Sequence, residues 1–233
     1  IEFYESGSTL ADGAIFNRAV TPEVRAIDDI DPAPRVAATL DGAPYVHGTP
    51  VATEGVHTLF ATATDSAGNA ATGQVSFTLD LTPPLLTITA PAPDALLSTP
   101  RIAITGSTDD AISIRARRLE ATIDPLTKEF AIADVQLLEG VNEIVVVAVD
   151  RAGNTASQTL LVTRDTHAPE LLVATPAQGA CIDATAVDVT GIVNDTRVQA
   201  VRVRAAGAVY DAALAPNGQW SVRVPTPVEG DLT

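Results

Sequence analysis

Aspartate residues recur in this 233-residue chain at positions that follow predicted β-strands or lie between them. Carboxylate and amide oxygens from flexible loops are the ligands that Ca²⁺ prefers, and the ion takes about six to eight of them. Clustered carboxylates repel one another unless a cation or a hydrogen bond neutralises them. The pattern therefore predicts calcium at two junctions between successive domains. The candidate ligands are Asp80, Asp109, Asp110 and Asp150 at the first junction and Asp165, Asn194 and Asp195 at the second.

The same aspartates also have a purely structural interpretation. An Asp at the end of a strand can accept hydrogen bonds from the backbone a few residues on, and other loop carboxylates commonly face water. The stretch Asp65-Ser66-Ala67-Gly68-Asn69 fits such a turn, because Gly and Asn both tolerate positive φ. A further acidic group, Asp28, Asp29 and Asp31, repeats the theme earlier in the chain. On the sequence alone, the calcium and turn interpretations both stay open.

Side chains arranged for catalysis are scarce. His47, His57 and His167 do not form an HxH or HExxH spacing, which metal-dependent hydrolases use. The sequence has no GxSxG elbow and no Gly-rich phosphate loop, so it lacks the usual marks of an activated nucleophile or a nucleotide site. Cys181 is the single cysteine and cannot form an internal disulfide. The chain is predicted not to be an enzyme.

The elements that position these residues are set by an internal repeat of 85 residues. The loop that starts at Asp65 returns at Asp150, Glu54-Gly55 returns as Glu139-Gly140, and Ile104-Thr105-Gly106 returns as Val189-Thr190-Gly191. A fixed period of this length indicates tandem domains and exceeds the units of most solenoids. We call these domains modules 1, 2 and 3.

Within each module the apolar residues alternate with period two, which predicts strands. The inward positions are Leu59, Ala61 and Ala63 before the first repeated loop, with Val75, Phe77 and Leu79 after it, and Ile144, Val146, Ala148, Leu160 and Val162 around the second. Pro- and Gly-rich breaks interrupt any helical period. Trp220 takes the place of Phe130 in the repeat and is predicted to lie in a core rather than on a binding platform.

The order of motifs resembles bacterial immunoglobulin-like (Big-type) tandem repeats. The motifs are Thr82-Pro83-Pro84 at the start of module 2, Val189-Thr190-Gly191 in the middle of module 3, and then EGVN from Glu139, VDRAGN ending at Asn154 and a closing Asp165. Modules 2 and 3 are similar to the variant found in the B domain of glucodextranase. This resemblance implies an all-β chain of tandem immunoglobulin-like antiparallel β-sandwiches. It says little about function, since such modules serve as spacers, stalks, adhesin arms and enzyme accessories.

The repeat also sets the expected boundaries. We place module 1 at residues 1–81, module 2 at 82–165 and module 3 at 166–233. Ile1 aligns with Leu86, inside a strand, so the first strand of module 1 is expected to be cut. Module 3 is expected to lack its last two strands, which a longer chain, or a second chain by donor-strand addition, would supply. The chain is expected to be a fragment of a longer repeat protein.

Charge and composition restrict the classes of partner that the chain is expected to bind. The net charge of −15 disfavours nucleic acid, which is itself a polyanion. No apolar run reaches the roughly 18 to 20 residues of a membrane span. Aromatic residues make up only 4%, which weakens a carbohydrate-binding role. The predicted partners are the other modules of the same longer chain, with a glycan or surface receptor left open.

The sequence therefore predicts a non-catalytic, extracellular stalk or spacer of a bacterial surface or secreted multi-repeat, adhesin-like protein. The alternative is a set of accessory, carbohydrate-binding modules of a secreted glycoside hydrolase. Calcium at the module junctions is the one cofactor that either interpretation includes.

Overall fold

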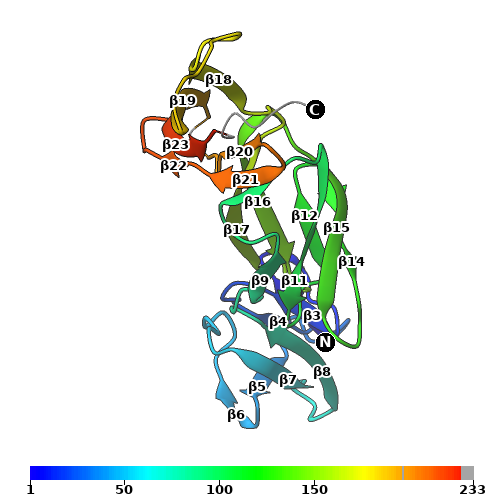
Figure 1. Cartoon of the computed structure of the whole chain (residues 1–233). Helices are drawn as coiled ribbons and strands as arrows, with labels where there is room; N and C mark the ends of the chain where they lie inside the picture. The colour runs from blue at the N-terminus through cyan, green and yellow to red at the C-terminus, as the bar shows by residue number, and fades with distance from the viewer. Residues whose placement is uncertain (196, 227–233) are drawn as a thin grey trace. The chain divides into compact units, whose positions relative to one another are not determined.

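The computed structural model describes residues 1–195 and 197–226 and is built from strands β1 to β23 (Figure 1). No α-helix occurs in these residues, and none of their elements is a helix long and apolar enough to cross a membrane. Contacts between residues divide the chain into two compact units, Ile1–Thr166 and His167–Thr233. The first unit contains modules 1 and 2, and the second contains module 3.

Module 1 consists of two sheets. The smaller has the order β2 (Ser8–Thr9), β1 (Glu2–Glu5) and β4 (Glu23–Arg25). The larger has the order β3 (Ala14–Phe16), β8 (Ala70–Leu79), β7 (Gly55–Thr64), β5 (Arg35–Leu40) and β6 (Ala43–Tyr45). The neighbours in both sheets are antiparallel except for β3, which runs parallel to β8.

Module 2 repeats this plan with one more strand in its smaller sheet. That sheet has the order β14 (Thr122–Ile123), β15 (Glu129–Gln136), β11 (Arg101–Thr108) and β9 (Leu86–Ala90). The other has the order β10 (Ala95–Leu97), β17 (Thr155–Arg164), β16 (Gly140–Val149), β12 (Ser113–Ala116) and β13 (Leu119–Glu120). Here β10 pairs in parallel with β17, in the place that β3 takes beside β8.

Module 3 has two sheets within the described residues. One has the order β18 (Glu170–Thr175), β19 (Ala186–Asn194), β23 (Gln219–Pro225) and β22 (Ala213–Leu214), and the other pairs β20 (Arg202–Ala205) with β21 (Ala208–Asp211). The segment that the repeat places before the missing strands, around Val228, lies outside the described residues. The proposed incompleteness of this module therefore stays a prediction.

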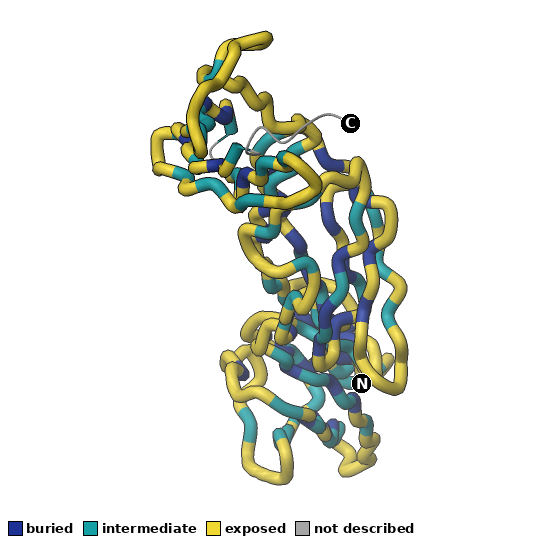
Figure 2. The backbone as a smooth tube through the Cα atoms, in the orientation of Figure 1, coloured by how far each residue is buried: buried dark blue, intermediate teal, exposed yellow. Residues whose placement is uncertain are grey.

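Period-two alternation places one side of each long strand in a core, as the sequence predicts. The predicted inward residues of β7, β8, β16 and β17 are all buried, and Figure 2 shows buried and exposed positions alternating along the strands. Three separate clusters of buried residues result: one around Leu59 and Phe77, one around Ile104 and Ile144, and one around Val193 and Trp220. The chain is therefore all-β, built of tandem immunoglobulin-like antiparallel sandwiches.

The two copies of the repeated loop are hairpin turns. The first joins β7 to β8 and the second joins β16 to β17, and both pairs are antiparallel over their full length. The three buried clusters fall within the three predicted modules, while the grouping of contacts joins the first two modules into one unit. The exact boundaries at residues 81 and 165 stay predictions.

Candidate metal centre at the junction of modules 1 and 2

Three of the predicted ligands meet where module 1 ends and module 2 begins. Asp80 follows β8, Asp110 lies between β11 and β12, and Asp150 follows β16. One carboxylate oxygen from each lies within 4.8 Å of the others. The side chains come from positions 30 to 70 residues apart, so the fold, and not local sequence, creates the cluster.

Asp150 is the buried member, with 2% of its surface exposed. Its Oδ1 accepts hydrogen bonds from the amides of Gly153 and Asn154 at 2.7 and 2.8 Å, and its Oδ2 accepts one from Asn154 Nδ2 at 2.9 Å. These contacts satisfy the buried charge and close the β16–β17 turn. A carboxylate oxygen has more than one lone pair, so Asp150 can bind a cation while it keeps these bonds.

Asn154 connects the two modules, a role that the sequence analysis did not assign to it. Its Nδ2 donates to the carbonyl of Asp80 at 2.8 Å and contacts the carbonyl of Thr82 at 3.3 Å, in addition to Asp150. The signal was present in the sequence, because Asn154 ends the repeated loop. In module 1 the matching Asn69 bonds only Asp65 of its own turn among the contacts recorded for its side chain.

Asp109 stands beside the cluster and has a different partner. Its Oδ1 accepts the amides of Leu85 and Asp110, both at 2.8 Å. The first of these bonds fixes the residue that follows the proline pair of the linker. Asp109 is not among the three residues whose oxygens gather within 4.8 Å.

The pKa values of Asp109 and Asp110 are shifted in opposite directions. Burial raises the pKa of Asp110, and the hydrogen bond and charge of Asp109 and the charges of Asp150 and Asp80 raise it further. Burial opposes ionisation of Asp109 too, but the hydrogen bonds from Leu85 and Asp110 outweigh it and lower the pKa of Asp109. The cluster therefore resists carrying its full negative charge, and a bound cation would relieve that repulsion.

The structure places the second predicted ligand set on two units. Asp165 follows β17 in the first unit, where its amide donates to the carbonyl of Leu97 at 2.9 Å. Asn194 ends β19 in the second unit, and Asp195 follows it, with Oδ1 accepting the amide of Arg197 at 2.8 Å. A calcium site formed by these three residues stays a prediction.

In module 1, Asp28 and Asp31 of the further acidic group accept hydrogen bonds from the backbone of turns. Asp28 Oδ1 accepts the amides of Ile30 and Asp31, and Asp31 Oδ2 accepts the amide of Ser66 from the β7–β8 turn. Asp65 accepts the amides of Ala67 and Asn69. For Asp65 the turn interpretation accounts for the side chain.

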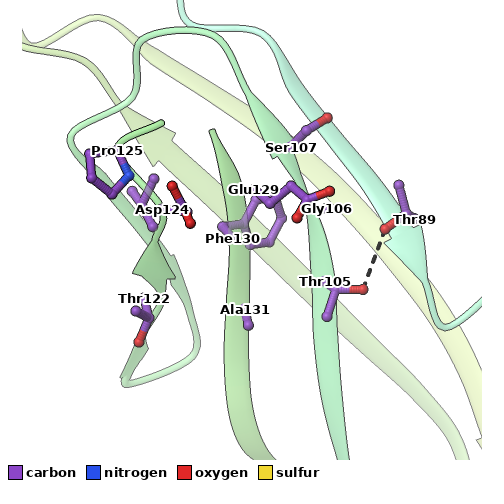
Figure 3. Close-up of a pocket in the computed structure, with 11 residues that line it drawn as sticks. Thr89, Thr105, Gly106, Ser107, Thr122, Asp124, Pro125, Glu129, Phe130 and Ala131 are labelled. Atoms are coloured by element: carbon purple, nitrogen blue, oxygen red, sulfur yellow. Dashed lines mark hydrogen bonds between the residues drawn. The ribbon is translucent and has the colours of Figure 1, made fainter. Parts of the chain in front are cut away.

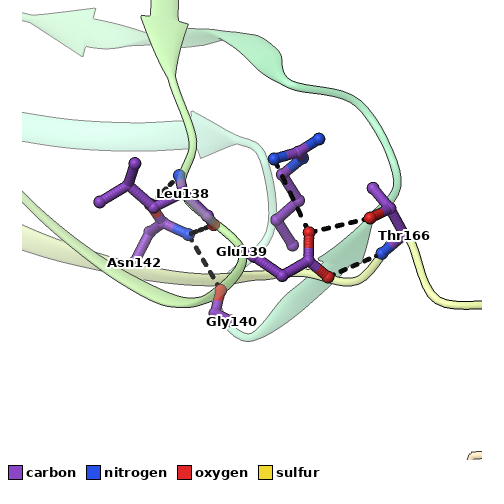
Figure 4. Close-up of polar contacts among 6 residues, drawn as sticks. Leu138, Glu139, Gly140, Asn142 and Thr166 are labelled. Atoms are coloured by element: carbon purple, nitrogen blue, oxygen red, sulfur yellow. Dashed lines mark hydrogen bonds and ion pairs between the residues drawn. The ribbon is translucent and has the colours of Figure 1, made fainter.

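Both linkers are also held by a glutamate at the start of a long strand. Glu54 precedes β7, and its two carboxylate oxygens accept the Thr82 hydroxyl at 2.9 and 3.0 Å. Glu139 precedes β16 and accepts the amide and hydroxyl of Thr166 at 2.9 and 3.0 Å (Figure 4). Arg164 lies 3.7 Å from the same carboxylate. The Glu-Gly pair was recognised in the sequence only as a mark of the repeat, because its partner lies 27 or 28 residues away.

A shallow recess of about 770 Å³ lies on the smaller sheet of module 2 (Figure 3). Thr89, Thr105, Asp124 and Glu129 line it, and Phe130 lies beneath with only 2% exposed. A similar recess of about 560 Å³ occupies the equivalent place in module 3, over Trp220. Trp220 is 3% exposed, so the prediction that it is a core residue is confirmed, and neither aromatic ring offers a flat surface to a sugar.

His57 and Cys181 show no pairing of a nucleophile with a base. His57 bonds Asp41 and the carbonyl of Thr53, and no Ser, Thr or Cys side chain is recorded among its partners. Cys181 is exposed and free.

Comparison with known proteins gives limited information. No family model matches the chain, and no curated protein matches it. The fibronectin(III)-like modules of Clostridium thermocellum CbhA align with 13% identity and a TM-score of 0.42, over 70% of this chain and 95% of that one. A tetra-tandem repeat from the extending region of a large adhesion protein aligns with 20% identity and a TM-score of 0.33, over 89% of this chain and 61% of that one.

A Ca²⁺-stabilised adhesin with which an Antarctic bacterium binds ice aligns with 21% identity and a TM-score of 0.34. The alignment covers 89% of this chain and 60% of that one. The chain therefore spans about three fifths of either adhesin structure. Because these TM-scores lie below 0.5, the likenesses carry no argument about function. The fold class rests on the strands and cores of the chain itself.

Proposed function

We propose that this chain is a non-catalytic spacer from a bacterial surface or secreted multi-repeat protein. The observation that carries the proposal is the junction of modules 1 and 2, where side chains from both modules hold one short linker. Glu54 binds Thr82 from the side of module 1, while Asn154 and Asp109 bind Asp80 and Leu85 from the side of module 2. The prolines at 83 and 84 stiffen the same segment. A spacer needs such fixed junctions, whereas an enzyme or receptor needs a site.

The chemistry of the module fits this role. The net charge of −15 keeps an extended chain soluble and separated from other acidic surfaces. The resemblance to Big-type repeats, with the glucodextranase-like variant in modules 2 and 3, supports a location outside the cell. The partners would be further modules of the same protein, with a glycan or surface receptor bound elsewhere on it.

Calcium at the first junction extends the proposal. Asp80, Asp110 and Asp150 supply three hard oxygen ligands from three loops, and the carbonyls and water could complete the shell. An ion that binds only the native junction stabilises it by about 4 kcal/mol at a thousandfold excess over its Kd. Asp109 would act beside the site by holding Leu85.

One observation favours a second candidate function, that of accessory carbohydrate-binding modules of a secreted glycoside hydrolase. The recess of module 2 is repeated in module 3 at the same place in the fold. Threonine hydroxyls and the carboxylates of Asp124 and Glu129 could hydrogen-bond a sugar there. The burial of both aromatic rings argues against it.

A pair of spin labels tests the spacer. Cys181→Ser removes the native thiol, and Ala67→Cys and Leu126→Cys place labels on exposed positions of modules 1 and 2. We expect a single narrow distance distribution in the full chain with calcium and a broader one with chelator. A broad distribution under both conditions would contradict the spacer, and an equally narrow one under both would contradict the calcium site alone.

Ligand measurements separate the remaining possibilities. Calorimetry with Ca²⁺ should show binding that Asp110→Asn weakens and that the exposed control Asp134→Asn leaves unchanged. Incubation with a panel of polysaccharides should show neither hydrolysis nor saturable binding. Saturable binding that Glu129→Gln weakens would favour the accessory-module function.

A further inference from the structure

His57 occupies an unusual position for a titratable group in this chain. It lies near the start of β7 with 6% of its surface exposed, and its ring lies 5.4 Å from that of Phe77. Its Nδ1 lies 2.7 Å from Asp41 Oδ2, and its Nε2 lies 2.7 Å from the carbonyl oxygen of Thr53. A carboxylate and a carbonyl can only accept hydrogen bonds. Both contacts are hydrogen bonds only when both ring nitrogens carry a proton, that is, when His57 is an imidazolium.

We call the turn that leads into the long strand β7 or β16 the corner of a module. Module 2 forms this corner without a titratable group. The repeat places Asn142 at the position of His57 and Leu138 at the position of Thr53. Asn142 is 4% exposed, its Nδ2 donates to the carbonyl of Leu138 at 2.7 Å, and its Oδ1 accepts the amide of Leu138 at 2.9 Å (Figure 4). An amide makes these bonds at any ordinary pH. The two modules therefore differ in whether this corner depends on a proton.

The corner in module 1 is connected to the linker. The carbonyl that His57 binds belongs to Thr53, and the next residue is Glu54, whose carboxylate accepts the hydroxyl of Thr82. Gly55, with φ 130°, completes the turn into β7. A change in the hydrogen bond at Thr53 is therefore one residue away from the side chain that fixes the linker.

The charged groups around His57 are acidic and favour its protonated form. The β5–β6 turn contributes Asp41, whose Oδ1 also accepts the amide of Thr58. Strand β8 contributes Phe77 and has no titratable side chain between Ala70 and Leu79. Glu54 is the charged group on the turn itself. No basic side chain faces the ring from these elements.

The direction of the pKa agrees with this geometry. Burial alone would lower the pKa of His57, but the hydrogen bonds to Thr53 and Asp41 and the charge of Asp41 outweigh it, so its pKa lies above the ordinary value. Burial raises the pKa of Asp41, but the bonds from His57 and Thr58 and the charge of His57 outweigh it, and the net shift is downward.

We infer that His57 is a pH-dependent latch for the first module junction. The imidazolium holds the turn at Thr53, and through Glu54 the turn holds the linker at Thr82. When His57 loses its proton, one ring nitrogen keeps only a lone pair and faces a hydrogen-bond acceptor. The hydrogen bond to either Thr53 or Asp41 is then lost. The raised pKa means that this stabilisation is complete below the unfolded value of about 6.5 and is lost as pH rises through the folded pKa. The latch is a property of module 1 and holds whether or not the chain serves as a spacer.

Nuclear magnetic resonance of the full chain tests the protonation directly. The ring nitrogens of His57 should both carry protons at pH 6, and the titration midpoint of His57 should lie above the ordinary value of about 6.5. In Asp41→Asn the midpoint should fall, because the facing charge is gone. A midpoint of His57 at or below that value, or one protonated nitrogen at pH 6, would overturn the proposal.

The junction is tested with the same spin-label pair in the Cys181→Ser background, between pH 6 and pH 9. The distance distribution of the parent should broaden as His57 loses its proton, and the amide of Thr58 should lose hydrogen-exchange protection severalfold. His57→Asn, which copies module 2, should lose this pH response, and His47→Asn should keep it. A parent distribution that does not change with pH, or a response that survives in His57→Asn, would refute the latch. If His57→Asn does not fold, the shift of the response to lower pH in Asp41→Asn decides the question.

Discussion

The two DxAGN loops hold the same side chains in different surroundings. In each, an Asp accepts two backbone amides and one Asn amide, which is the hydrogen bonding of a turn. Asp150 is buried beside Asp80 and Asp110, whereas Asp65 lies at the far end of module 1 with its bonds open to water. The same DxAGN pattern therefore gives a turn in one module and a turn plus a candidate cation ligand in the next.

Replacing these two aspartates should separate the effects of turn and burial. Asp150→Ala leaves the amides of Gly153 and Asn154 without their partner in a buried place, which should cost about 1–3 kcal/mol of the free energy of unfolding. Asp65→Ala removes equivalent bonds near solvent and should cost less, because water replaces the carboxylate. Denaturant melts of the full chain followed by module-specific amide signals measure both. Equal losses would mean that burial of Asp150 contributes nothing.

At the residue scale, the sequence grouped three acidic residues that the structure brings together, but it did not reveal their hydrogen-bond partners. Asp80, Asp110 and Asp150 could be grouped because a sandwich brings known strand ends together. Asn154, Glu54 and Glu139 were missed as junction residues because their hydrogen bonds depend on linker geometry, which no period in the sequence encodes. Asp109 accepts the amide of Leu85, and its assignment as a ligand stays a prediction.

The elements show where a small residue is required. Strand β11 shifts register against β9 between Thr105 and Gly106, and β19 shifts against β18 at Gly191 in the same way. A Cβ on Gly106 would lie 2.6 Å from the ring of Phe130 and also against the carbonyl oxygen of Thr87. The repeated Thr-Gly was noted in the sequence as a mark of the period. Glycine is required at this position because the backbone and the aromatic ring approach it so closely.

Gly106→Ala should therefore destabilise module 2 specifically. The added methyl meets backbone that cannot rotate away, and overpacking of this kind costs about 1–3 kcal/mol. Gly73→Ala is a matched control in module 1, since its Cβ would meet only side-chain atoms at 3.3 Å or more. Melts resolved by module should show the larger loss for Gly106→Ala. The interpretation of the bulge is wrong if the two variants are equally stable.

At the scale of the molecule, the alternation of apolar residues and the 85-residue period predicted the strands, the hairpins and the inward positions. These features repeat locally, so they can be identified from a single sequence. The extents of the modules are harder to predict, because side chains such as Asn154 bond across the first boundary and the first two modules form one compact unit. The sequence could not reveal that coupling.

Separate cores still predict separate folding. Module 2 has thirteen buried hydrophobic residues of its own, so residues 83–165 alone should give a dispersed spectrum and one cooperative melt. The fragment should be less stable than module 2 in the full chain, since Asn154 loses its bond to Asp80. A fragment that stays unfolded would show that module 2 needs module 1 for its core.

The parallel strand pairs determine how the modules would respond to tension. In module 1, β3 is bonded to β8, flanked by Gly13 to Ser76 and Asp80 to Phe16 backbone bonds of 2.8 and 2.9 Å. In module 2, β10 is bonded to β17 in the same manner. A pull on the two ends of a module drags parallel partners in opposite directions along their own axes. The bonds are then sheared together instead of being peeled apart in turn, so several must break before the chain lengthens. Forced extension is limited by the rate of unfolding, and modules 1 and 2 would thus each act as a mechanical clamp.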